Sequence, residues 1–217
     1  MLAGTLNAQT APPVPANGWD STYRPGNYAQ QVETFRAYPH HTTDIVFLGN
    51  SITAGVNWNE LLENGNAHNR GISGDITFGV LERLDEVISG KPAKVFILIG
   101  INDISRNIPD SVIIANHRRM VQRIKAGSPK TKIYFQTLLP VNNTFTQFKN
   151  HYNKDEHIKA VNDALWKLGK EEHITIIDLN KPFQDAEGKL IKDITRDGLH
   201  LKYEGYLIWA KVLKPYL

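Results

Sequence analysis

The 217-residue chain contains no cysteine, which excludes disulfide scaffolds, iron–sulfur clusters, zinc ribbons and cysteine nucleophiles. It has no apolar run near the ~20 residues that a transmembrane helix needs. Its formal net charge is only +3, which does not indicate nucleic-acid binding without a clustered basic patch. A chain of this length buries about 70% of its unfolded surface on folding. We therefore expect one folded domain that needs no covalent or metal cross-link.

The chain also lacks the signatures of several cofactor-dependent classes. It has no Gly-Lys-Ser/Thr phosphate loop and no Gly-x-Gly-x-x-Gly segment opening a helix. No group of histidines has the spacing of zinc ligands. The basic stretch 118–132 spreads its Lys and Arg residues over a helix surface, as is typical of a solvated face. We expect no cofactor, no metal and no nucleic-acid partner.

Residues 1–27 differ in composition from the rest of the chain. Residues 2–8 are small and largely apolar, and residues 9–15 form a polar, proline-rich stretch typical of a linker. One interpretation is the end of a secretory signal cleaved after Ala8, which predicts a periplasmic or secreted protein. The alternative is an ordinary tail on a cytoplasmic protein. Residues 28–217 are expected to form a single domain.

From residue 44 onward, short apolar runs alternate with segments of helical periodicity. Strands are predicted at 44–49, 67–72, 95–100, 132–138 and 174–179, and helices at 30–36, 78–88, 112–126, 158–168 and 203–217. This alternation is typical of an α/β protein, in which a parallel sheet is covered by helices on both faces as a three-layer α/β/α sandwich. Functional sites in such sheets lie beyond the carboxyl ends of the strands.

Two segments far apart in the sequence carry side chains suited to nucleophilic catalysis. Ser51 directly follows the first strand, where a tight turn presents a hydroxyl at the sheet edge; the alternative is that it only caps a helix. Asp197 precedes His200 by three residues. This spacing lets the carboxylate accept from Nδ1–H while Nε2 takes a proton from a hydroxyl. The alternative is an Asp-Gly turn followed by a surface histidine. The other seven histidines have no such partner and are predicted to lie at the surface or in interfaces.

Two further strand ends offer hydrogen-bond donors. The glycine-rich segment 71–75 can expose a backbone N–H, and Asn102 follows the most apolar strand. Such donors can stabilise the oxyanion of an acyl-transfer reaction, although the same residues are also common in plain turns. The distinctive feature is the set of four segments in one order, each at a strand end or before the last helix.

These four segments resemble the sequence blocks of the SGNH (GDSL-type) hydrolases. They are Gly49-Asn50-Ser51-Ile52, Asn69-Arg70-Gly71-Ile72-Ser73-Gly74-Asp75, Gly100-Ile101-Asn102-Asp103 and Asp197-Gly198-Leu199-His200. The resemblance implies a flavodoxin-like, five-stranded parallel sheet in the order 2-1-3-4-5. It implies Ser51 as nucleophile, His200 as general base and Asp197 as its orienting carboxylate. The oxyanion donors would be the N–H groups of Ser51 and Gly74 and the Asn102 side chain.

One residue departs from the family pattern, because Asn50 stands where the family usually has an aspartate. An amide can still fix the turn by hydrogen bonds, so we expect activity to persist. Asn50 is also a candidate substrate contact. Two more candidates, Asn142 and Phe145, lie in loop 141–148, which mixes amides, hydroxyls and aromatic rings as a sugar-binding surface does. The alternative is a plain surface loop with Phe145 and Phe148 in the core.

Within this family, the residues of the four blocks most resemble those of carbohydrate acetylesterases and platelet-activating-factor acetylhydrolase-like proteins. We expect a serine esterase that removes short acyl groups, chiefly acetyl, from carbohydrate through an acyl-enzyme. The alternative is a lysophospholipase or acetylhydrolase acting on a lipid ester. A third hypothesis is a non-catalytic carbohydrate-binding relative. The absence of a long apolar lid disfavours long-chain lipases.

Overall fold

The computed structural model describes residues 18–217, so the suggested signal remnant lies outside the described residues. All five predicted strands form, and they make one parallel sheet in the order β2-β1-β3-β4-β5. Their bounds are β1 Ile45–Gly49, β2 Ala67–Gly71, β3 Lys94–Leu98, β4 Lys132–Gln136 and β5 Thr175–Ile177. The predicted fold class and strand order are confirmed.

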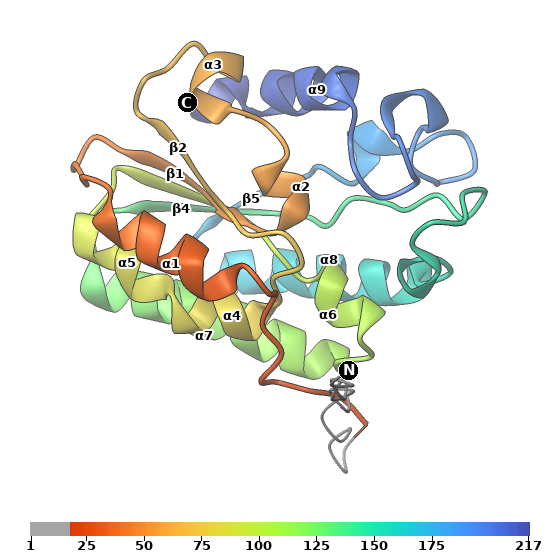
Figure 1. Cartoon of the computed structure of the whole chain (residues 1–217), viewed down its shortest axis with the longest axis horizontal. Coiled ribbons are helices and arrows are strands. Elements are labelled where there is room, and N and C mark those ends of the chain that lie inside the picture. Colours follow the sequence, from red (N-terminus) through yellow and green to blue (C-terminus); the bar gives the residue numbers. More distant parts are fainter. Residues whose placement is uncertain (1–17) are drawn as a thin grey trace, which may run out of the picture.

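Helices cover both faces of the sheet (Figure 1). One face carries α1 Tyr28–Ala37, α4 Thr77–Glu82, α5 Leu84–Gly90, α7 Asp110–Gly127 and α8 Asp155–Glu171. The other face carries α3 Trp58–Leu61 and α9 Tyr203–Leu213. Short helices α2 Ser51–Ala54 and α6 Ile101–Ser105 follow β1 and β3 directly. The single-turn helices are η1 Lys149–His151, η2 Lys181–Phe183, η3 Lys192–Ile194 and η4 Lys214–Tyr216.

The central strands are buried on both faces, which explains their uninterrupted apolar runs. Phe47 of β1 packs against Trp58 of α3 and Phe96 of β3, with ring centroids 4.0 and 5.0 Å apart. The next residue, Leu48, points to the opposite face and belongs to the cluster that includes Leu84 of α5. None of these side chains is appreciably exposed. The central strands β1 and β3 therefore contribute to two separate core layers.

Two predicted helices are wrong in extent. The segment predicted as one helix over 78–88 is two helices, α4 and α5, which meet at Arg83 (φ −97°, ψ 8°). The Arg83 side chain is drawn into the core by Asp75 and the Gly49 carbonyl, and this tertiary contact is invisible to helical periodicity. The last helix stops at Leu213, since Pro215 lacks the N–H that a continuing α-helix requires.

Residues 18–27, predicted as the end of a linker, are packed on the domain instead. The Trp19 ring stacks on Phe78 with centroids 5.9 Å apart. Arg24 forms an ion pair with Glu82 of α4. Their contacts make this segment part of the folded unit within the described residues.

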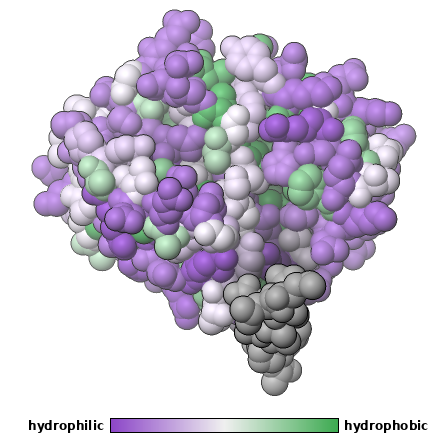
Figure 2. Space-filling view, in the orientation of Figure 1, coloured by the Kyte–Doolittle hydropathy of each residue, from purple (hydrophilic) through white to green (hydrophobic). Residues whose placement is uncertain are grey.

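The face seen in Figure 2 is mainly hydrophilic, with hydrophobic residues in small, separate groups. Among the described residues, no helix is long and apolar enough to cross a membrane.

Candidate active site

The sequence-predicted residues gather at the carboxyl ends of the parallel strands. Ser51 opens α2 immediately after β1, Gly74 lies in the loop after β2, and Asn102 lies in α6 after β3. Asp197 and His200 lie in the loop that precedes α9. Figure 1 shows α2, α6 and this loop at the same end of the sheet.

Ser51, His200 and Asp197 form a continuous hydrogen-bonded chain. The Ser51 Oγ lies 3.0 Å from His200 Nε2. The His200 Nδ1 lies 2.9 Å from Asp197 Oδ2, so the carboxylate fixes the ring with its Nδ1–H toward Asp197. Nε2 is then left as an acceptor for the serine proton. The structure thus brings together residues 149 positions apart in the geometry of a nucleophile and its base.

The Asp197 carboxylate is held in its ionised form. Burial by itself raises the pKa of this group, but the backbone and ring N–H groups of His200 and the Leu199 N–H donate to the carboxylate and outweigh burial. The pKa of Asp197 consequently lies below its ordinary value. One carboxylate therefore both caps the turn at residues 197–200 and orients the imidazole ring of His200.

The turn that carries Ser51 depends on its two preceding residues. A Cβ on Gly49 would lie 2.2 Å from Thr53 Oγ1 and 2.4 Å from the Leu98 carbonyl, so only glycine fits this position. Asn50 caps α2, because its Oδ1 accepts the Ile52 N–H at 3.0 Å. The Asn50 side chain is 1% exposed, so it holds the turn from within and does not reach the cleft as a substrate contact.

Gly74 and Asn102 face the same cleft as Ser51. Gly74 has φ +82°, a conformation that favours glycine and turns the backbone of this loop. The Asn102 Nδ2 donates to the Asp75 carbonyl at 2.9 Å, and an amide nitrogen carries a second hydrogen. No described residue accepts that second hydrogen, which leaves it for a group bound in the cleft.

The other predicted substrate contacts lie elsewhere. The Asn142 side chain is buried, donates to the Leu190 carbonyl and accepts from Thr144. Phe145 packs on the loop of the histidine, where a Cβ on Gly198 would come within 3.0 Å of its ring. Neither residue lines the cleft beside Ser51. Asn142 holds its own loop from the interior, and Phe145 packs against the loop of the histidine.

Two histidines predicted to lie at the surface or in interfaces are withdrawn from solvent: His117 is fully buried, and His151, which is half-buried, belongs to the site. The His117 Nε2–H donates to the Ile99 carbonyl at 3.0 Å, and burial lowers the pKa of His117 to about 4. His151 of η1 lines the cleft, with its Nε2 3.0 Å from Asn102 Oδ1. Burial, with a contribution from His200, lowers the pKa of His151 to about 4. No spacing signal in the sequence pairs His151 with Asn102.

The residues on either side of η1, which carries His151, also contact His200 and its loop. The Phe148 ring meets the His200 ring edge to face with centroids 4.8 Å apart. Tyr152 accepts the Phe148 N–H at 3.2 Å and donates its hydroxyl to the Asp197 carbonyl. Loop 141–153 thus contacts both halves of the site.

The cleft beside Ser51 has a volume of about 940 Å³. Most of its lining residues are polar or charged. Those with large apolar side chains are Trp19, Phe148 and Leu199. Among the described residues, no group of three or more His, Cys, Asp or Glu side chains is arranged to hold a metal ion.

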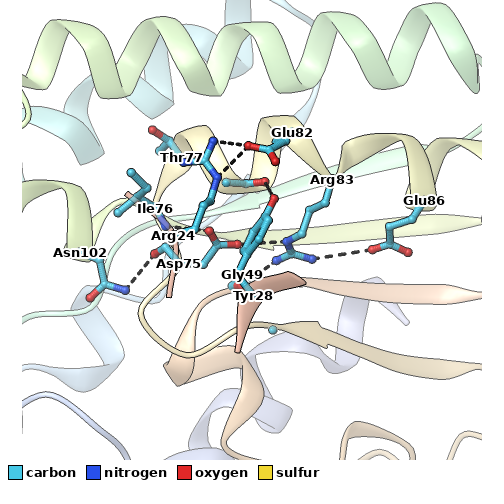
Figure 3. A network of polar contacts seen from close by, with 12 residues as sticks. Arg24, Tyr28, Gly49, Asp75, Ile76, Thr77, Glu82, Arg83, Glu86 and Asn102 are labelled. Carbon is cyan, nitrogen blue, oxygen red and sulfur yellow. Dashed lines mark hydrogen bonds and ion pairs between the residues drawn. The ribbon is translucent and has the colours of Figure 1, made fainter. Parts of the chain in front are cut away.

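Beneath the cleft lies a network of buried charges, drawn in Figure 3. Arg83 has no exposed side-chain surface and donates to Asp75 Oδ2 at 3.0 Å and to the Gly49 carbonyl at 3.1 Å. Its Nη1 lies 3.7 Å from Glu86, which is also paired with Arg70. Arg83 therefore ties the Ser51 turn to the segment that carries Gly74.

A second buried carboxylate, Asp103, anchors the neighbouring helix. It accepts both the backbone N–H and the hydroxyl of Thr77, at the start of α4. Burial raises the pKa of Asp103 to about 7. Through Asp103 and Asp75, α6 is fixed against the loop after β2.

Comparison with known proteins agrees with this geometry. Residues 47–208 match the model of the GDSL-like Lipase/Acylhydrolase family. The chain belongs to this family. One similar solved structure comes from Streptococcus pneumonia, and its name refers to platelet activating factor. It is 30% identical in sequence, and it superposes with a TM-score of 0.80 over 88% of this chain and 92% of that chain.

Curated relatives are more distant. Platelet-activating factor acetylhydrolase IB subunit alpha2 from Rattus norvegicus is 28% identical over 79% of this chain and 73% of its own length. N-acylneuraminate cytidylyltransferase from Streptococcus agalactiae is 26% identical over 73% of this chain, but the match covers only 35% of that protein. The chain thus spans about a third of the length of that relative.

Proposed function

We propose that this GDSL-type esterase removes acetyl or similarly short acyl groups from carbohydrate, with Ser51 as nucleophile. The observation that carries the proposal is the 3.0 Å contact between Ser51 Oγ and a His200 ring that Asp197 orients. In the proposed reaction His200 Nε2 takes the Ser51 proton as Oγ attacks the ester carbonyl. The N–H groups of Ser51 and Gly74 and the Asn102 amide stabilise the oxyanion.

The second half of the reaction uses the same groups. The C–O bond of the ester breaks, and the departing alcohol takes the proton from His200 while the acyl group remains on Ser51. A water molecule then gives a proton to His200 and attacks the acyl-enzyme. The acid is released as Ser51 recovers its proton. Every proton in this cycle moves between Oγ, Nε2 and the reacting oxygens.

The composition of the cleft supports a small acyl group on a polar alcohol. A long acyl chain needs an extended apolar wall, which three large apolar side chains do not provide. Amides, hydroxyls and charged groups suit the hydroxyls of a sugar, and Trp19 and Phe148 offer rings for its faces. The relative named for N-acylneuraminate adds support for a sugar-derived substrate.

A second candidate is an acetylated lipid. It is favoured by the likeness to the acetylhydrolase subunit, whose name refers to platelet-activating factor. An acetyl group occupies the same position near Ser51 in either case. The two candidates therefore differ only in the alcohol that the rest of the cleft must hold.

The test compares the protein with Ser51→Ala and with Ser73→Ala, an exposed serine of the same cleft. On p-nitrophenyl acetate, Ser51→Ala should lose on the order of 10⁴-fold or more in kcat, whereas Ser73→Ala should stay within a few-fold. A Ser51→Ala variant with a tenth of the normal activity would refute the nucleophile.

Substrate class is tested separately. Turnover should fall from acetate to octanoate esters, and acetate release from acetylated oligosaccharides should exceed release from a 2-acetyl glycerophospholipid. The opposite order would favour the lipid ester.

A further inference from the structure

We propose that His151 is a positioning residue that holds the Asn102 amide in the orientation needed to stabilise the oxyanion. The inference rests on the proposed role of Asn102. It starts from a single contact between the two side chains, His151 Nε2 to Asn102 Oδ1 at 3.0 Å.

The direction of that hydrogen bond follows from the partners of Asn102. The Asp75 carbonyl only accepts, so the amide group that faces it at 2.9 Å is the NH₂ end. The oxygen of Asn102 must then face His151, and an amide oxygen only accepts. His151 is therefore the donor and carries its hydrogen on Nε2. The low pKa of His151, caused mainly by burial, keeps the ring neutral.

This arrangement holds the amide at both of its ends. One N–H is bound to the Asp75 carbonyl, the oxygen is bound to His151, and only the second N–H remains for the cleft. Without His151 the amide keeps a single anchor and can rotate about the bond to its Cβ. A donor is useful in catalysis only while it points to the site where the negative charge develops.

His151 is itself held firmly enough to act in this way. Its backbone N–H donates to the Phe148 carbonyl at 2.8 Å, and the Phe148 ring packs edge to face on the His151 ring at 5.8 Å. Tyr152, the next residue, joins the segment to the Asp197 loop. The Nδ1 atom of His151 is buried and has no partner in the described part of the chain. The single N–H of the neutral ring is therefore bound to Asn102.

Three substitutions separate the hydrogen bond from the shape of the ring. His151→Gln keeps an N–H donor near the position of Nε2. His151→Phe keeps a ring against Phe148 but has no donor, and His151→Leu is a second variant without a donor. We expect His151→Phe to lower kcat on p-nitrophenyl acetate by roughly 10-fold with little change in KM, less than the 10²–10³-fold expected from deleting a donor. His151→Gln should remain within about 3-fold of the unmodified protein.

The decisive measurement is a double-mutant cycle with Asn102→Ala. If His151 acts through Asn102, then His151→Phe should change kcat by less than about 2-fold when Asn102 is already alanine. A loss of equal size in both backgrounds would show a general structural effect and overturn the proposal. Normal kcat in both donor-less variants, with melting temperatures unchanged, would do the same.

The single variants Asn102→Ala and His151→Phe distinguish a failure of the His151 role from a failure of the Asn102 role. If Asn102→Ala alone retains normal kcat, the oxyanion role of Asn102 fails. If Asn102→Ala loses activity while His151→Phe does not, only the role of His151 fails.

Discussion

Replacing Arg83 with methionine tests whether the buried charge network beneath the site is needed for the fold. The guanidinium binds the Asp75 carboxylate and the Gly49 carbonyl and lies near Glu86, with no surface exposed (Figure 3). Methionine fills much of the same volume but carries no charge. Two carboxylates that share Arg83 would then lie in the core with less compensation.

The magnitude follows from these contacts. Removing one partner of a buried ion pair costs about 3–5 kcal/mol, because the other charge remains without compensation. Arg70 still faces Glu86, which keeps the loss toward the lower end of that range. We expect the free energy of unfolding to fall by about 3 kcal/mol, a large fraction of the 5–15 kcal/mol typical of a domain. Urea unfolding followed by tryptophan fluorescence measures this, since Trp58 and Trp209 are fully buried.

The loss of folding stability in Arg83→Met should also depend on pH. Burial raises the pKa of both Asp75 and Glu86, and Arg83 opposes that rise, so its removal raises both pKa values further. A carboxyl whose pKa is higher in the folded than in the unfolded state binds protons more tightly when folded. Lowering the pH from 7 to 5 therefore favours the folded variant. The stability difference from the unmodified protein should narrow over this range.

Arg36→Met is the matched control, because Arg36 of α1 forms an exposed ion pair at 3.1 Å with Asp85 of α5, the helix that also carries Glu86. Exposed pairs contribute about 0–1 kcal/mol. The reasoning is refuted if Arg83→Met costs no more than this control, or if its deficit is the same at pH 5 and pH 7.

Two further substitutions test the loops around the histidine. Asp197→Asn should lower kcat on p-nitrophenyl acetate by about 10⁴-fold, because an amide no longer favours the ring orientation that leaves Nε2 free; a loss below 10-fold would remove Asp197 from the mechanism. Tyr152→Phe should lower the free energy of unfolding by about 1–2 kcal/mol, because the Phe148 N–H and the Asp197 carbonyl lose their shared partner. Thermal unfolding measures the second effect, and an unchanged melting temperature would contradict it.

The central strands β1 and β3 were predictable because each carries its own sequence signal. The apolar runs that contain Phe47 and Phe96 are buried on both faces, and no other element accommodates such a run as well. The helix over 78–88 was not predictable in detail. Its periodicity is continuous, and the break at Arg83 comes from a side chain that bonds to residues 8 and 34 positions earlier. Periodicity contains no information about such distant partners.

The site shows the same division between local and distant signals. The pairing of Asp197 with His200 depends on three residues of spacing, so sequence alone could propose it, and the structure has the two side chains 2.9 Å apart. Asn142 was chosen for its residue type and lies in the interior, where its partner is the Leu190 carbonyl. His151 meets Asn102 across 49 positions and from a different loop, so only the fold brings them together.

The two sides of the cleft are held by different interactions, and this separates their expected defects. On one side, the Ser51 turn and the Gly74 loop depend on Arg83 and its buried partners, whose loss chiefly costs folding free energy. On the other side, His200 and His151 lie in partly exposed loops joined by Phe148 and Tyr152. Substitutions of His200 and His151 leave the charged network intact, so these two should alter kcat more than stability. A variant of His151 that unfolds the protein as readily as Arg83→Met would contradict this division.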